Sequence, residues 1–118
     1  CGKHSFELGY KGMRSLLRLP EPPTAVILGN YDTTLGGIMA VNESGFTCPG
    51  DISILGFDDL LMSKVIRPKL WFVAQPMEAM AKKAVEMLLN RISRQEEGSP
   101  LRISFSAGIS EGDSIRRL

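Results

Sequence analysis

The fold is decided by residues 25–59, which read AVILGNYDTTLGGIMAVNESGFTCPGDISILGFDD. Two short apolar runs, residues 25–28 and 52–57, have the pattern of strands that are buried in a parallel sheet. Apolar residues at helical spacing predict a helix over residues 33–44, and Gly45 is suited to end it in the left-handed conformation. A strand, a helix and a strand make a βαβ unit, so we expect parallel strands joined by a right-handed crossover.

The segments on either side continue the alternation of strands and helices and predict an α/β fold class. We expect a helix over residues 5–18, a strand over 70–74, a helix over 77–93 and a last strand over 101–106 at a sheet edge. Ser5 is the expected N-cap of the first helix, and the prolines within residues 20–23 stop it. Gly36 and Gly37 lie inside a predicted helix and are expected to permit close packing.

Composition indicates an ordinary globular chain with room for one compact domain. The hydrophobic content of 43% and the charged content of 23% are typical of such proteins. The net charge of +1 comes from scattered cations, whereas sequence-independent DNA binding needs clustered ones, so we expect no direct grip on nucleic acid. Cys1, Cys48 and His4 are too few for a disulfide framework or a metal site, so we expect reduced thiols, no metal, no cofactor and a cytoplasmic location.

Neither a membrane span nor a signal peptide is expected. No apolar run approaches the ~18 residues that cross a bilayer, and the first residues lack the features of a secretory leader. The chain reads as though it begins partway through a longer protein, just ahead of a helix.

Polar residues follow two of the expected strands directly. Asn30, Tyr31 and Asp32 come after the first strand, and Asp58 comes after the second. In open parallel sheets, ligands bind beyond the carboxyl ends of the strands, so Asn30 and Asp58 could hold the same small molecule. The alternative is that Asn30 and Asp32 only turn the chain and cap the next helix. On the residues alone, both interpretations stay open.

Four phrases stand in order along the chain: PTA at residues 23–25, NYD at 30–32, PGDISILGFDD at 49–59 and QP at 75–76. Their order and spacing resemble the pattern of the LacI/GalR family of bacterial transcription regulators, over about residues 6–118. The resemblance implies a periplasmic-binding-protein-like type I core, in which two α/β subdomains hold an effector between them.

The resemblance also implies how the chain divides. Residues 1–66 would belong to the C-terminal subdomain, residues 67–98 would supply a strand and a helix of the N-terminal subdomain, and residues 99–118 would hold the returning strand. On this basis the chain is mostly C-terminal subdomain and lacks the DNA-binding headpiece. We therefore expect that it alone neither binds operator DNA nor holds an effector tightly.

Candidate effector contacts follow from the same resemblance. Asp58 and Asn30 match family positions that hydrogen-bond the effector, and His4 falls where members often stack an aromatic ring on it. In many family members an acidic residue directly follows the asparagine, whereas here Asp32 stands one residue further along the chain. His4 is also the only residue that titrates near neutral pH when unperturbed, although a histidine near a chain end is more often simply exposed.

The implied function is effector sensing and dimerisation for a DNA-binding repressor, without catalysis. The effector would be a small polar molecule, a sugar or sugar derivative, and the partners a second copy and, through the headpiece, operator DNA. The alternative is a solute-binding protein of a sugar transport system, which shares the fold. The apolar stripe of the helix over residues 77–93 should fold back or be exchanged with a second copy.

Two short motifs are set aside. Residues 108–112 read GISEG, the pattern of a nucleophile elbow, but no histidine follows to complete a catalytic triad. Residues 42–44 read NES, a glycosylation sequon that a cytoplasmic protein would not expose to glycosylation.

Overall fold

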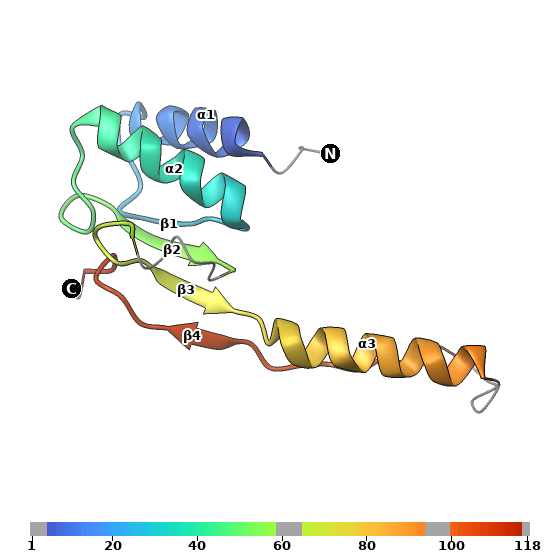
Figure 1. Ribbon diagram of the computed structural model, residues 1–118. Coiled ribbons are helices and arrows are strands. Elements are labelled where there is room, and N and C mark those ends of the chain that lie inside the picture. Colours follow the sequence, from blue (N-terminus) through green and yellow to red (C-terminus); the bar gives the residue numbers. More distant parts are fainter. Residues whose placement is uncertain (1–4, 59–64, 94–99, 117–118) are drawn as a thin grey trace. The chain divides into compact units, whose positions relative to one another are not determined.

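The structure, a computed structural model, describes residues 5–58, 65–93 and 100–116 (Figure 1). Its elements in chain order are α1 Phe6–Leu17, β1 Ala25–Ile27, α2 Tyr31–Ser44, β2 Ser53–Phe57, β3 Trp71–Ala74, α3 Met77–Ile92 and β4 Gly108–Ser110. The mixture of helices and strands confirms the predicted α/β class. Among the described helices, none has both the length and the apolar character needed to cross a membrane.

The chain divides into two compact units, not the single one that its length suggests. The first unit comprises Cys1–Ala74 and Ile109–Leu118, and the second comprises Gln75–Gly108. β3 pairs with β2 and so belongs to the first unit, and the division between the units follows Ala74. The assignment of these parts to subdomains of a larger core stays a prediction.

A four-stranded sheet has the order β1-β2-β3-β4. β1 and β2 are parallel with Ile27 opposite Leu55, which confirms the pairing expected of the βαβ unit. β2 and β3 are parallel as well, with Phe57 opposite Val73. In Figure 1 the arrow of β4 runs against that of β3. The carboxyl ends of β1, β2 and β3 therefore lie along one edge of the sheet.

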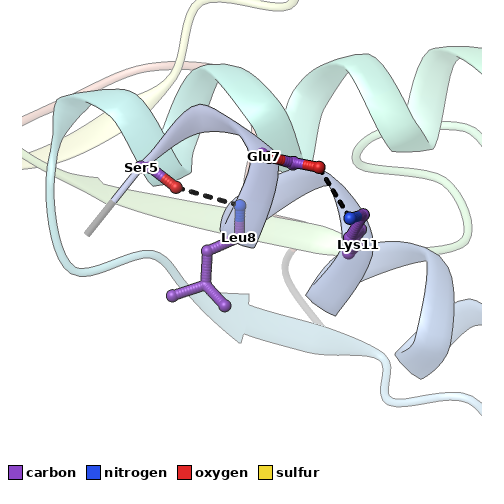
Figure 2. A network of polar contacts seen from close by, with 4 residues as sticks. All are labelled: Ser5, Glu7, Leu8 and Lys11. Atoms are coloured by element: carbon purple, nitrogen blue, oxygen red, sulfur yellow. Dashed lines mark hydrogen bonds and ion pairs between the residues drawn. The ribbon is translucent and has the colours of Figure 1, made fainter. Parts of the chain in front are cut away.

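Helix α1 begins where the sequence predicts. The Ser5 hydroxyl accepts a hydrogen bond from the backbone N–H of Leu8 at 3.3 Å, so Ser5 is the N-cap (Figure 2). Glu7 and Lys11 form an exposed ion pair with 2.6 Å between Nζ and Oε1. The hydrogen bond and the charge of Lys11 hold the pKa of Glu7 below its ordinary value. Because exposed pairs add little stability, the cap and the packing of α1 matter more.

Helix α2 begins two residues earlier than its apolar periodicity predicts. Its N-cap is Asn30, whose side chain forms a reciprocal capping box with Thr33. The first turn, with Tyr31 and Asp32, lies outside the apolar stripe and so gives no periodic signal. Gly45 ends the helix with a φ of 82°, which confirms the predicted left-handed cap.

Glycines let α1 and α2 pack with their backbones in contact. A Cβ atom added at Gly9 would overlap the backbone of Thr33, and one added at Gly36 would overlap the backbone of Phe6. The expectation of close packing at Gly36 is confirmed. The apolar core of the first unit lies beneath these helices and contains Met13, Leu17, Leu28, Ala40, Val41, Ile52, Ile54, Leu70 and Phe72.

The second unit is far less packed. Helix α3 buries none of its side chains, and Leu88 and Ile92 are 59% and 69% exposed. The strand predicted over residues 101–106 is wrong, because these residues form no strand and β4 begins two residues later. The alternating side chains of Ile103 and Phe105 instead line a hollow along α3. The alternation of apolar and polar residues correctly indicated that Ile103 and Phe105 share one side of the segment. It did not indicate that this side faces a helix.

Candidate functional site

The edge formed by the carboxyl ends of the strands carries the two best-supported candidates. Asp58 follows β2 directly, and Asn30 follows β1 after two residues. Since Ile27 lies opposite Leu55, Asn30 and Asp58 each stand three residues beyond a paired position. Both residues are half-buried. The edge thus presents an amide and a carboxylate at the place where parallel sheets bind ligands.

Asn30 caps α2, and this fixes its side chain. Its Oδ1 accepts hydrogen bonds from the backbone N–H of Thr33 at 2.9 Å and from the Thr33 hydroxyl at 2.7 Å. The capping interpretation of Asn30 is therefore confirmed. Within the part of the chain that the structure describes, the amide nitrogen of Asn30 makes no hydrogen bond. Capping consequently leaves two N–H donors for an acceptor on a ligand.

Asp58 stands in a strained backbone conformation. Its φ is 68°, in the left-handed region that non-glycine residues seldom adopt and where such strain costs about 1–3 kcal/mol. The backbone N–H of Asp58 donates to the carbonyl oxygen of Val73 at 3.0 Å, so β3 holds the residue in this conformation. Strain that the surrounding structure maintains at the carboxyl ends of parallel strands favours a functional role for the side chain.

The other two candidates differ in what the structure says of them. Asp32 is exposed in the first turn of α2, where a carboxylate stabilises the positive end of the helix dipole. Helix formation alone therefore explains its position. His4 lies outside the described residues. Effector contact by either residue stays a prediction.

Sequence reasoning missed the two threonines that hold Asn30. Thr33 and Thr34 are buried: the Thr33 hydroxyl also accepts from the backbone N–H of Asn30 at 3.3 Å, and the Thr34 hydroxyl donates to the carbonyl oxygen of Asn30 at 2.6 Å. The available signal was the spacing of Asn30 and Thr33, which is that of a capping box. These bonds couple the start of α2 rigidly to the candidate site.

Ser114 is a second residue that the sequence did not single out. It is fully buried, and its hydroxyl donates to the carbonyl oxygen of Ile54 at 2.6 Å and accepts from the N–H of Trp71 at 2.9 Å. Its own carbonyl oxygen accepts from the N–H of Ile54 at 2.9 Å. The C-terminal segment thereby ties β2 to β3 near the starts of both strands, away from the candidate site.

The surroundings of Ser110 and Cys48 do not favour a role as catalytic nucleophiles. Ser110 ends β4, and the following residues 111–116 form no helix, so the strand-to-helix turn of a nucleophile elbow is missing there. Burial raises the pKa of the Cys48 thiol, which lowers its reactivity at neutral pH. Among residues 5–58, 65–93 and 100–116, no group of three or more His, Cys, Asp or Glu could hold a metal ion.

Comparison with known proteins identifies the family to which the chain belongs. The family model for the periplasmic binding protein-like domain matches residues 3–115. The protein named "Probable HTH-type transcriptional repressor ExuR" from Bacillus subtilis is 38% identical over 117 residues, covering 99% of this chain and 35% of that protein. The HTH-type transcriptional repressor CytR from Escherichia coli is 36% identical over 102 residues, covering 86% of this chain and 30% of that protein. The chain thus spans about a third of the length of these relatives.

Solved structures share the fold. A LacI family transcriptional regulator from Enterococcus faecium, crystallised with bound ribose, aligns with a TM-score of 0.81 and 28% identity. The alignment covers 94% of this chain and 40% of that chain. These matches confirm the resemblance that the ordered phrases indicated. The chain therefore belongs to the periplasmic binding protein-like domain family, and the proteins that it matches are transcriptional repressors and a LacI family transcriptional regulator.

Proposed function

We propose that this chain is the effector-sensing part of a LacI-family transcriptional repressor and that its effector is a small polar molecule of the sugar class. The observation that carries the proposal is the strained Asp58 on the same sheet edge as Asn30. A carboxylate acceptor and amide donors are groups that hydrogen-bond sugar hydroxyls. The ribose-bound regulator from Enterococcus faecium supports this class of ligand.

The proposed mechanism is a shift between two states of the regulator. Asn30 is tied to the start of α2 by its capping bonds, and Asp58 is tied to β3 through Val73. A sugar that bridges Asn30 and Asp58 would act on both elements at once. It changes operator affinity only to the extent that it binds one state more tightly than the other.

The proposal includes a homodimer, a DNA-reading headpiece outside this chain and a cytoplasmic location, where operator DNA is accessible. Exposed apolar residues of α3 support the dimer, since Val85, Leu88 and Ile92 are each more than half exposed. An apolar stripe of this kind is normally covered, and a second copy is one surface that could cover it. We propose no catalytic activity, because effector binding is sufficient for the role.

A thermal-shift screen of the intact regulator against sugars and sugar derivatives tests the proposal. We expect one compound to raise Tm, with a stabilisation of about 2.7 kcal/mol at a hundred times its Kd. The same compound should change the affinity of the regulator for operator DNA, measured by fluorescence anisotropy. Stabilisation without any change in operator affinity would favour the solute-binding alternative. A panel without a single stabilising sugar would refute the sugar class.

A further inference from the structure

A cavity of about 310 Å³ lies between the C-terminal ends of α1 and α2. Its lining consists of Arg14, Leu17 and Arg18 of α1, Ala40, Glu43 and Ser44 of α2, and the following Phe46. Helix α2 begins at the sheet edge that carries Asn30 and ends at this cavity. The cavity is therefore at the opposite end of α2 from Asn30 and Asp58. It is a place separate from the effector site proposed above.

The floor of the cavity is apolar. Leu17 and Ala40 are 7% and 0% exposed and belong to the core, while Phe46 is half-buried and packs against that core. These side chains are held by their packing, so the floor keeps its shape without a ligand. Its volume is at the lower end of the range of about 300–1,000 Å³ found for ligand pockets. The cavity can thus accept the apolar body of a small molecule.

The rim carries two guanidinium groups one helical turn apart. Arg14 is held in place, because its Nη1 donates to the Tyr10 hydroxyl at 3.2 Å and its guanidinium lies 5.5 Å from the centre of the Tyr10 ring. The Tyr10 hydroxyl in turn donates to the Glu43 carboxylate. Within the described residues, the side chain of Arg18 makes no hydrogen bond or ion pair. The rim therefore has more positive than negative charge and a guanidinium whose donors are unused.

We propose that this cavity is a second binding site, specific for a small organic carboxylate with an apolar body. The forked donors of Arg18, with Arg14 beside it, would bind the carboxylate through charge-assisted hydrogen bonds. The apolar body would rest on Phe46 and on the exposed part of Leu17. The proposal goes beyond the proposed sugar effector, since it concerns another part of the molecule and another class of ligand.

Calorimetric titration of the full-length protein with sodium benzoate tests the site. Benzoate should bind at one site per chain, and Arg18→Gln should weaken its binding by about tenfold or more, as expected for loss of a charge-assisted hydrogen bond. Lys11→Gln is the matched control, because Lys11 is an exposed cation of α1 outside the cavity. It should leave the Kd for benzoate within about twofold.

Neutral and inorganic probes separate the two parts of the proposal. Benzyl alcohol, which has the ring without the carboxylate, and inorganic phosphate, which has the charge without the ring, should each bind at least about tenfold more weakly than benzoate. These comparisons use the unmodified protein and hold even if Arg18→Gln folds poorly. Absence of benzoate binding, equal binding of either control probe, or equal loss in Lys11→Gln and Arg18→Gln would overturn the proposal. None of these outcomes bears on the sugar site.

Discussion

The two units of the chain contain amphipathic helices whose apolar side chains differ greatly in exposure. In the first unit, α1 and α2 touch at Gly9 and Gly36, and Met13 is 2% exposed. In the second unit, α3 buries no side chain, and Leu88 is 59% exposed. Since α1 and α3 both carry apolar stripes, the difference lies in the surface that each of these two helices meets. The first unit therefore contains its own core, whereas the second depends on a covering surface.

The largest effect is expected where the helices of the first unit touch. Gly9→Ala should lower the free energy of unfolding by at least about 3 kcal/mol, because the new methyl group meets the backbone of Thr33, which cannot rotate away. Urea denaturation measures the loss. Gly12→Ala is the control, since its Cβ would enter open space in the same helix and should stabilise α1 by about 0.5–1 kcal/mol. Equal effects of both changes would contradict the close contact.

A pair of truncations compares the two units directly. Met13→Ala removes a core side chain of α1 and should cost about 2–5 kcal/mol. Leu88→Ala removes an exposed side chain of α3 and should change the stability of this chain by less than about 1 kcal/mol. Thermal unfolding followed by circular dichroism measures both. A cost at Leu88 that matches the cost at Met13 would mean that another surface, such as a second copy of the chain, covers α3.

The buried hydroxyl of Ser114 is expected to stabilise the first unit. Ser114→Ala should cost about 1–3 kcal/mol, because the N–H of Trp71 and the carbonyl oxygen of Ile54 lose a buried hydrogen-bond partner. Ser15→Ala is the control, since that exposed hydroxyl donates to the Lys11 carbonyl oxygen and its loss should cost within about 0.5 kcal/mol. Urea midpoints that coincide for the two variants would refute the role of Ser114.

The smallest effect is expected at the strained residue of the sheet edge. Asp58→Gly should be more stable than Asp58→Ala by about 1 kcal/mol, because glycine adopts a positive φ without the steric cost of a Cβ atom. Both variants lack the carboxylate, so their difference isolates the backbone. Equal unfolding temperatures would show that Asp58 is not held in the left-handed conformation.

Much of the first unit could be predicted from the sequence because its signals are local. The caps Ser5 and Gly45 and the apolar runs of β1 and β2 each act within a few residues, and all were placed correctly. The edge position of Asn30 and Asp58 also followed, since the end of a parallel strand is readable from its apolar run.

The rest depended on contacts between distant residues. Ser114 could not be recognised, because a serine gives no sign of burial and its partner Ile54 lies 60 residues away. The left-handed conformation of Asp58 depends on a bond from another strand, to Val73. The false strand over residues 101–106 arose because alternation shows which side is apolar but not whether a strand or a helix lies against it.

We propose that Asp58 and Asn30 together bind the effector, and isothermal titration of the full-length protein with a sugar that raises its Tm measures this binding. Asp58→Asn tolerates the positive φ but removes the charge, and Asn30→Asp keeps the helix cap but removes the amide donors. We predict that each raises the Kd by about tenfold or more while Asp32→Asn leaves it within about twofold. Wild-type affinity in both Asp58→Asn and Asn30→Asp would contradict the account.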